Sequence, residues 1–449
     1  METKCQLVEK YRDLMFRTLD YIWKNPETGY REWKTHAYLE EEFAKLGYEL
    51  TLAGDIPGFT AELDTGKPGP TVAVFGELDS ILCANHPDSD PETGAVHACG
   101  HCAQTAALLG LAGALKEPGA LEGLSGKIRL VAVPAEELLE LEYRKELRNK
   151  GVIRYFGGKP EFLYRGLLDG VDISFMIHTA EYAPGVGGII AGYNGCVAKN
   201  ISFRGLSAHA GGSPHRGINA LYAANVAMTA INALRETFED GAHIRVHPII
   251  TAGGGAVNAI PDDVRMESYV RAADVEHIVM ANKKVNRAVA AAALALGANV
   301  VLEDVPGYMP GINDPGMIEA MKQAMTDVGL EVKHRVTGWS TGCSDMGDMS
   351  VVMPTIHPYI GGATGAGHGE DYRIADPETA CVSSAKAQLQ MLRILLSNDA
   401  ERAKKIIEDY QPTFATKEEY FATMDRMNLN CQAVEYEGEN KAVLTFGNE

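Results

Sequence analysis

The stretch KIRLVAVPAEE, residues 127–137, is an apolar run that ends in two adjacent glutamates. Two other runs share this design: TVAVFGELDS (71–80) also ends in acidic residues, and VDISFMIHTA (171–180) ends near a histidine. Helical stretches such as TAALLGLAGALKE (105–117) separate the runs. Largely apolar runs in this alternation are typical of central strands in a mostly parallel sheet. The sequence therefore predicts an α/β domain.

A segment of different character interrupts this pattern at residues 195–305. AKNISFRGLSAHA (198–210) and RMESYVRAADVE (265–276) alternate like half-exposed strands, and each is accompanied by a long helical stretch. Two strand-helix units of this kind indicate an α+β sandwich inserted into the first domain. We expect the chain to divide into a catalytic part, an inserted lid and dimerisation domain, and a second catalytic part with a C-terminal extension, at residues 1–194, 195–305 and 306–449.

Composition narrows the class of protein. The net charge of −19 and the absence of a Lys/Arg patch oppose nucleic-acid binding. No stretch has the length and apolarity of a signal peptide or a membrane span, so we expect no membrane association and a cytoplasmic location. The eight cysteines are scattered, which favours buried thiols or metal ligands in a reducing compartment.

Potential metal ligands follow the predicted strands. In open α/β sheets, ligands bind beyond the carboxyl ends of the strands, so Glu77, Asp79, the glutamate pair and His178 could share one crevice. HACGHCAQT (97–105) falls between a strand and a helix and could reach the same place. Taken alone, its Cys-x-x-Cys is compatible with a metal site, a disulfide, a redox pair or half of a zinc knuckle. Buried glutamates need cations or protons, and a metal pair would supply that charge.

Several motifs, in order along the chain, resemble those of the M20 metallopeptidases and amidohydrolases. The resemblance is to the M20D branch, which includes aminoacylase-like, indole-acetyl-amino-acid and aminobenzoyl-glutamate hydrolases. It runs over about 390 residues and rests on six stretches: NPETGYREWKTHAYLEEEFAKLGY (25–48), GELDS (76–80), HACGH (97–101), VPAEE (133–137), SAHAGGSPHRGINAL (207–221) and GAGHGEDYRIAD (365–376).

The resemblance implies a dinuclear metallohydrolase domain in which Glu136 is the general base. The five implied metal ligands, with the first as a bridging thiolate, are Cys99, His101, Glu137, His178 and His368. Thiolate, imidazole and carboxylate together suit two zinc ions, with manganese, cobalt or nickel as substitutes. Water on such cations becomes a nucleophile near neutral pH.

The inserted domain also acquires roles by resemblance. The resemblance implies a homodimer formed through this domain, in which His209 would stabilise the oxyanion in its own or the partner subunit's site. Asn258 and Arg271 would hold the substrate's carboxylate. The simpler alternative makes His209 a turn residue and places Arg271 in a surface ion pair.

The expected activity is hydrolysis of the amide bond of an N-acyl amino acid or a short peptide-like molecule. The alternatives are a dipeptidase or a ureido or carbamoyl amidohydrolase on the same fold, and a catalytically inactive metal-binding or regulatory relative. Two positions depart from the branch's pattern, Cys102 and Gln104, where Asp or Asn and a further His are usual. We expect these two side chains to contact the metal ligands and to orient them without binding metal themselves. We further expect the unusually long segment 139–165 and the C-terminal tail to define the substrate.

Overall fold

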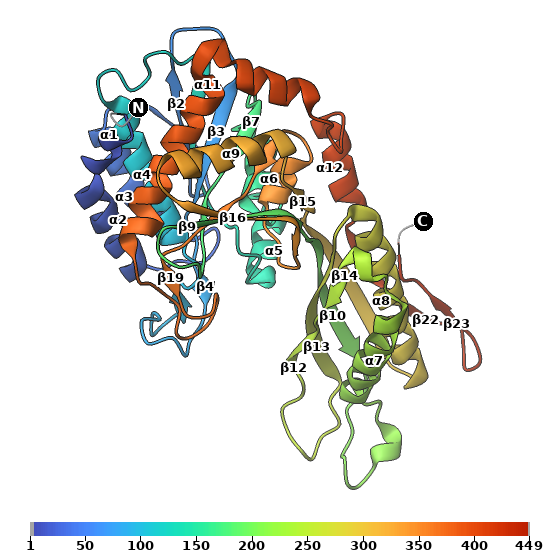
Figure 1. Cartoon of the computed structure of the whole chain (residues 1–449). Helices are drawn as coiled ribbons and strands as arrows, with labels where there is room; N and C mark the ends of the chain where they lie inside the picture. The colour runs from blue at the N-terminus through green and yellow to red at the C-terminus, as the bar shows by residue number, and fades with distance from the viewer. Residues whose placement is uncertain (1–3, 448–449) are drawn as a thin grey trace. The chain divides into compact units, whose positions relative to one another are not determined.

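The computed structural model describes residues 4–447, which form two compact units (Figure 1). The first unit consists of the chain up to Gly192, Gly311–Trp339 and Ser344–Thr413. The second consists of Tyr193–Pro310, Ser340–Cys343 and the chain from Phe414 onward. Among residues 4–447, no helix combines the length and apolarity needed to cross a bilayer.

A six-stranded sheet lies at the centre of the first unit. β3 (Thr71–Glu77) pairs in parallel with β6 (Lys127–Val133) on one side and with β7 (Ile173–Phe175) on the other. β7 pairs in parallel with β17 (Thr355–Ile356). Two antiparallel strands extend the sheet beyond β6. The prediction of an α/β domain with a mostly parallel sheet is confirmed. In spatial order the strands are β1 (Leu50–Leu52), β2 (Phe59–Asp64), β6 (Lys127–Val133), β3 (Thr71–Glu77), β7 (Ile173–Phe175) and β17 (Thr355–Ile356).

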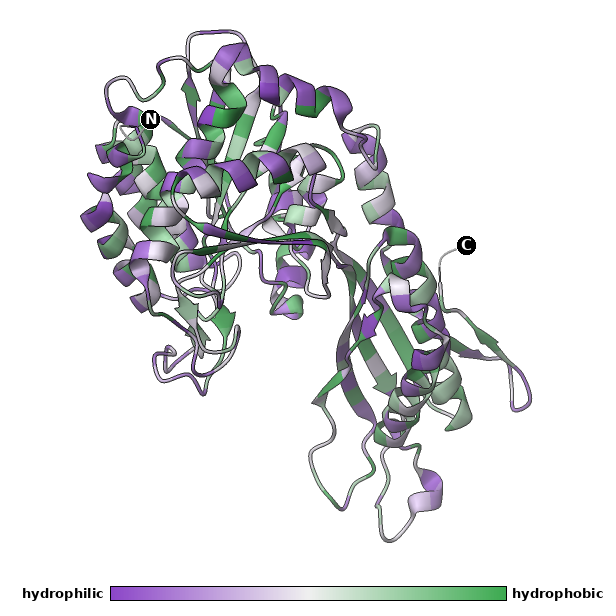
Figure 2. Cartoon of the chain, in the orientation of Figure 1, coloured by the Kyte–Doolittle hydropathy of each residue, from purple (hydrophilic) through white to green (hydrophobic). Residues whose placement is uncertain are grey.

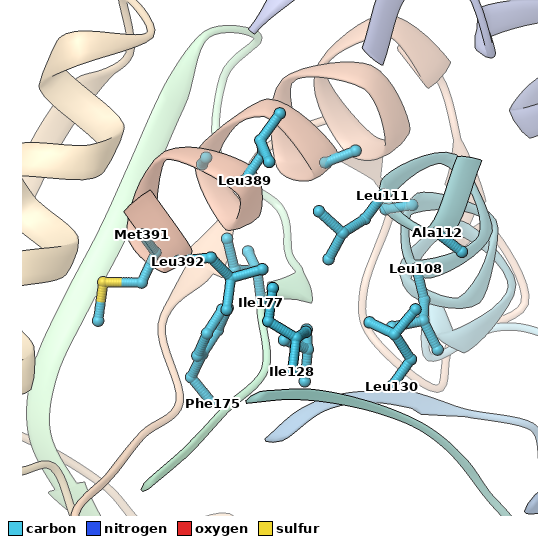
Figure 3. Close-up of a cluster of buried hydrophobic side chains, with 14 of the residues drawn as sticks. Leu108, Leu111, Ala112, Ile128, Leu130, Phe175, Ile177, Leu389, Met391 and Leu392 are labelled. Carbon is cyan, nitrogen blue, oxygen red and sulfur yellow. The ribbon is translucent and has the colours of Figure 1, made fainter. Parts of the chain in front are cut away.

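The helix α4 (His101–Lys116) packs on β3 and is buried at every residue before Lys116. The helices α2 (Arg12–Lys24) and α11 (Ser384–Asp409) also contact α4. The side chains of α4 are mostly small and apolar, so they can be buried on all sides. Figure 3 shows leucines of α4 and α11 meeting the apolar side chains of β6 and β7. In Figure 2 the central strands are largely green, whereas the outer helices alternate between purple and green. The first core therefore lies between the sheet and these helices.

A smaller sheet of the first unit positions His178. This residue begins β8 (His178–Thr179), which pairs in parallel with β18 (Tyr359–Ile360). β18 in turn pairs with β9 (Val186–Tyr193).

The segment 139–165 forms two helices, α5 (Leu141–Asn149) and α6 (Gly158–Tyr164). Helix α6 is buried from Gly158 to Leu163 and contacts β6. The segment is therefore folded into the first unit.

The second unit has an antiparallel sheet with two helices packed on it. β10 (Gly195–Arg204) pairs with both β13 (Asp263–Ala272) and β14 (Asn299–Tyr308). The helices α7 (Ala220–Leu234) and α8 (Val275–Ala295) contact these strands. The C-terminal tail contributes α12 (Lys417–Arg426) and β21 (Leu429–Gln432), and β21 extends the sheet beyond β14.

Candidate metal centre

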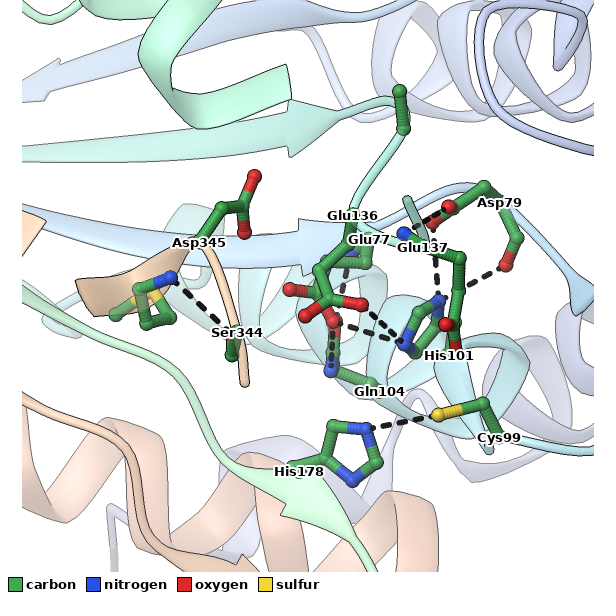
Figure 4. A network of polar contacts seen from close by, with 12 residues as sticks. Glu77, Asp79, Cys99, His101, Gln104, Glu136, Glu137, His178, Ser344 and Asp345 are labelled. Atoms are coloured by element: carbon green, nitrogen blue, oxygen red, sulfur yellow. Dashed lines mark hydrogen bonds and ion pairs between the residues drawn. The ribbon is translucent and has the colours of Figure 1, made fainter. Parts of the chain in front are cut away.

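Three parallel strands of the first unit carry polar residues at their carboxyl ends. β3 ends at Glu77, and Glu136 and Glu137 follow β6. His178 comes three residues after β7, and His101 is the first residue of α4. Since neighbouring parallel strands end at one edge of the sheet, these side chains converge there. Figure 4 shows them pointing toward one another.

The five predicted ligands form two donor groups that share one sulfur atom. In the first group, the donor atoms of Cys99, His101 and His178 all lie within 4.8 Å of one another. In the second, the donor atoms of Cys99, Glu137 and His368 satisfy the same limit. The Sγ of Cys99 lies 3.5 Å from Nε2 of His178, and Oε1 of Glu137 lies 3.0 Å from Nε2 of His368. One thiolate could therefore serve two neighbouring cations.

The donor set fits a pair of divalent ions of the zinc type. Each group combines one thiolate with imidazole or carboxylate, which are the donors that such ions prefer. Two of the buried donor atoms are Nε2 of His101 and Oε1 of Glu137. Their nearest charged contacts are carboxylate or imidazole atoms of the same cluster. Such atoms, aimed at a common point, are what a metal site requires.

The electrostatics of the metal-free cluster favour the deprotonated thiol and carboxyl ligands and the protonated imidazole of His368. Burial raises the pKa of the Cys99 thiol, but the imidazoles of His101 and His178 outweigh it and bring this pKa down to about 6. Burial likewise opposes ionisation of Glu137, yet hydrogen bonding to His368 lowers the pKa of that carboxyl to about 2. Hydrogen bonds to Cys99 and Glu137 raise the pKa of His368 to about 11. The thiolate and the carboxylate are thus held in the state that binds cations.

Glu136 lies beside the first donor group, with Oε2 3.9 Å from Nε2 of His101. It is nearly buried, at 8 % exposure. Burial, followed by the charges of Glu77 and Glu137, raises the pKa of Glu136 well above its ordinary value. A carboxylate that binds a proton readily, next to a metal site, has the properties of a general base.

Asp79 holds both donor groups in place. Its Oδ1 lies 3.1 Å from Nδ1 of His101, and its Oδ2 accepts a hydrogen bond of 2.7 Å from the backbone N–H of Glu137. Because Nδ1 of His101 faces Asp79, Nε2 faces the donor cluster. The sequence marked Asp79 only as an acid at a strand end and gave no sign of this double contact.

A buried polar network that the sequence did not predict adjoins the centre. The ammonium group of Lys159 contacts the carboxylates of Glu77 and Asp345, and all three side chains are fully buried. Gln104 donates from Nε2 to Oε2 of Glu77 at 3.0 Å and accepts from the Glu77 backbone N–H at 2.6 Å. Glu77 Oε2 also lies 3.2 Å from Nε2 of His101. The departure at position 104 is therefore part of a network that reaches a proposed ligand.

The other notable residues of HACGHCAQT lie away from the donor atoms. Cys102 is fully buried in the main hydrophobic core, and burial raises the pKa of its thiol to about 12. His97 is also buried, and neither of its ring nitrogens has a hydrogen-bond partner among residues 4–447. Neither cysteine of the Cys-x-x-Cys forms a disulfide within the described residues.

The remaining predicted site residues lie in the second unit. The Nδ1 of His209 accepts hydrogen bonds from two backbone N–H groups, with Gly212 N at 2.9 Å, and His209 pairs with Ala259 in a β-bridge next to Asn258. Arg271 lies near the end of β13, with its guanidinium 5.2 Å from the ring centre of Tyr269. The Nε of Arg271 is buried and lacks a hydrogen bond within the described chain.

The sequence was compared with those of known families and proteins. A family model described as "Peptidase family M20/M25/M40" matches residues 74–393. The chain therefore belongs to this family. The Xaa-Arg dipeptidase of Mus musculus is 29% identical over 393 residues, covering 83% of this chain and 81% of the relative. The indole-3-acetyl-aspartic acid hydrolase of Enterobacter agglomerans is 26% identical over 360 residues, covering 68% and 77%.

A solved structure shares the fold. It is that of a dinuclear metal-binding peptidase of the M20 family from Bacillus subtilis, with a TM-score of 0.64 and 21% identity, covering 86% of this chain and 99% of that one. The predicted family, the α/β fold and the class of enzyme, a metal-dependent amidohydrolase, are confirmed. The comparisons favour none of the alternative functions over this one.

Proposed function

We propose that this protein hydrolyses the amide bond of an N-acyl amino acid or a short peptide-like substrate at a centre of two divalent ions. The ions would be held by the five residues of the two donor groups. The observation that carries the proposal is that both groups share the Sγ of Cys99, with Glu136 beside the first of them. Bound divalent ions would polarise the substrate carbonyl and make a water molecule more acidic.

Individual residues of the chain would have separate roles in this reaction. Glu136 removes a proton from the attacking water and passes it to the departing amine, a role that its raised pKa supports. Asp79 orients His101 through Nδ1. In the second unit, His209 stabilises the oxyanion, and Arg271 and Asn258 bind the substrate's carboxylate. The unpaired buried Nε of Arg271 is a donor available for that carboxylate.

Zinc is the ion that we propose, because a thiolate takes part in both donor groups. Manganese, cobalt and nickel are the substitutes to be tested, since geometry selects among ions more strongly than intrinsic affinity does. A cytoplasmic location belongs to the same proposal. The eight cysteines are all free thiols, which is the state that a reducing compartment maintains.

The substrate class follows from the chemistry of the relatives' substrates. One named relative acts on an indole-3-acetyl conjugate of aspartic acid and another on dipeptides that end in arginine. Both substrates carry an amide next to a free carboxylate. The direct test is to reconstitute the metal-free protein with zinc or manganese and to follow a panel of N-acyl amino acids and dipeptides. Absence of turnover on the whole panel, with two ions bound, would overturn the proposal.

A homodimer formed through the second unit belongs to the proposal. His209 and Asn258 lie before the start of β13, whereas Arg271 lies near its end. Eight residues separate Asp263 from Arg271, a span of about 27 Å in a strand. One copy of the second unit therefore does not gather all three side chains at one place. Two copies related by a two-fold axis could each supply the groups that the other lacks.

The surface of the second unit supports such a dimer. β12 (Ile249–Ala252) pairs with β13 and has an exposed Ile249. On α7, Tyr222 and Val226 are exposed, Tyr222 at 61 %. An exposed strand edge and exposed apolar side chains are each features of surfaces that pair with another chain. Sedimentation of the intact protein at micromolar concentration tests this, and a monomer would contradict it.

A further inference from the structure

The segment 139–165 delivers a buried cation to the edge of the proposed metal centre. Lys159 lies in the first turn of α6, and its side chain is fully buried. Its Nζ lies 2.5 Å from Oε1 of Glu77 and also contacts Oδ1 of Asp345. The backbone N–H of Lys159 donates to Oδ2 of Asp345 at 2.9 Å. A lysine is almost never buried unless it is paired, and Lys159 is paired with two carboxylates.

The carboxylates around Lys159 would repel one another without it. Oxygen atoms of Glu77, Glu136 and Asp345 lie within 4.8 Å of one another. Three acids at this separation in a buried place need a cation. The ammonium group of Lys159 is a cation in direct contact with two of these acids, Glu77 and Asp345.

Glu77 connects Lys159 to α4, the helix that begins with the proposed ligand His101. Its side chain and backbone exchange two hydrogen bonds with Gln104, and its carbonyl oxygen accepts from Oγ1 of Thr105 at 2.6 Å. Gln104 and Thr105 belong to the first two turns of α4, which begins at His101. A shift of Glu77 would therefore move the start of the helix that carries His101.

The backbone at the start of α6 packs closely against residues 134–137, the loop that includes Glu136. The N–H of Gly158 donates to the carbonyl of Ala135 at 3.2 Å. A Cβ at position 158 would lie 1.7 Å from the carbonyl oxygen of Pro134, so only glycine allows this approach. Arg144 of α5 adds hydrogen bonds to the carbonyls of Phe156 and Glu137. The segment thus contacts residues 134–137 through the backbone of Gly158 and the side chain of Arg144.

We propose that Lys159 is a positioning residue of the metal centre, which holds Glu77 and, through Glu77 and Gln104, the helix turn that presents His101. This inference rests on the proposed function. It gives segment 139–165 a role in building the centre, in addition to any part it has in choosing the substrate.

The test must separate positioning from simple charge balance. Replacing Lys159 alone leaves Glu77 and Asp345 unpaired and could prevent folding. The double variant Lys159→Met/Asp345→Asn removes one positive and one negative charge together. The conservative variant Lys159→Arg keeps the cation. The matched control is Lys199→Met/Asp304→Asn, which removes an equally buried Lys-Asp pair from the second unit.

Zinc affinity, measured by competition with a chromophoric chelator, is the first readout, and it does not depend on turnover. We expect the Lys159→Met/Asp345→Asn variant to melt, without metal, close to the control variant and to bind zinc about 10- to 100-fold more weakly than wild type. Lys159→Arg should recover part of the affinity. In active protein, the double variant should lower kcat more than it changes KM.

Two outcomes would overturn the inference. One is wild-type zinc affinity in Lys159→Met/Asp345→Asn, and the other is an equal loss of affinity in the control variant. If the wild-type protein binds two ions but hydrolyses no amide, the proposed function fails while the zinc measurement still decides the role of Lys159.

Discussion

Asp79 connects the two proposed ligands His101 and Glu137, since one of its carboxylate oxygens faces a ring nitrogen and the other accepts a backbone N–H. An asparagine cannot accept from two N–H groups in this geometry, because its amide nitrogen would face one of them. Asp79→Asn should therefore weaken zinc binding about 10- to 100-fold. Chelator competition measures this. Asp172→Asn, which changes a carboxylate bound to the backbone N–H of Thr71 at the start of β3, should have wild-type affinity.

Glu136→Gln should remove turnover and leave the ions in place. The amide has the shape of the carboxylate but cannot take a proton from water, so kcat should fall about 10²- to 10⁴-fold. Elemental analysis of the same sample should still find two ions per chain. Retention of wild-type kcat would remove Glu136 from the mechanism.

The shared sulfur predicts different metal stoichiometries for two alanine variants. His368 belongs to one donor group only, so His368→Ala should retain a single ion per chain. Cys99 belongs to both groups, so Cys99→Ala should weaken both sites. Titration with zinc followed by elemental analysis distinguishes these cases. Two tightly bound ions in Cys99→Ala would show that Cys99 does not bridge.

His36, which lies outside the proposed metal centre, should make a contribution to stability that is lost on mild acidification. Its Nδ1 accepts a hydrogen bond of 2.9 Å from the N–H of Gly58, and burial lowers its pKa. The unfolded chain therefore binds the proton first, and stability present above about pH 6.5 is lost as the pH falls below that value. Denaturant unfolding at pH 7.5 and 5.5 should show a smaller loss in His36→Gln than in wild type.

Mixed dimers can show whether His209 acts in the partner's site. His209→Ala and Glu136→Gln subunits should each be inactive alone. After unfolding and refolding together, a mixed dimer would contain one site with both residues intact, so about a quarter of wild-type activity should return. Activity that stays at the level of the separate variants would place His209 in its own subunit's site or outside the mechanism.

The sheet and the ligand positions were predictable because they depend on local patterns. An apolar run buried on both faces is visible in the sequence, and a polar residue directly after it lies at the edge where parallel strands end. Glu137 and His178 are two such residues. The resemblance to M20 proteins supplied the roles, which the pattern alone left open.

The network around Lys159 could not be predicted in the same way. A lysine in a charged, aromatic segment reads as a surface residue, since lysine is rarely buried. Its partner Asp345 is 186 residues away, and nothing local in the sequence links the two. The pairing of β21 with β14 was missed for the same reason, because it joins the tail to a strand more than 120 residues earlier.

The sulfur atom common to both donor groups also makes the centre sensitive to covalent labelling. Cys99 is partly exposed, and its pKa of about 6 makes it a thiolate at neutral pH, whereas Cys102 and Cys381 are buried thiols with raised pKa values. The thiolate is the nucleophile toward alkylating reagents. One equivalent of iodoacetamide on Cys99 of the metal-free protein would remove a ligand from each group, and bound zinc would protect it. The rate of alkylation would then report on the occupancy of the centre.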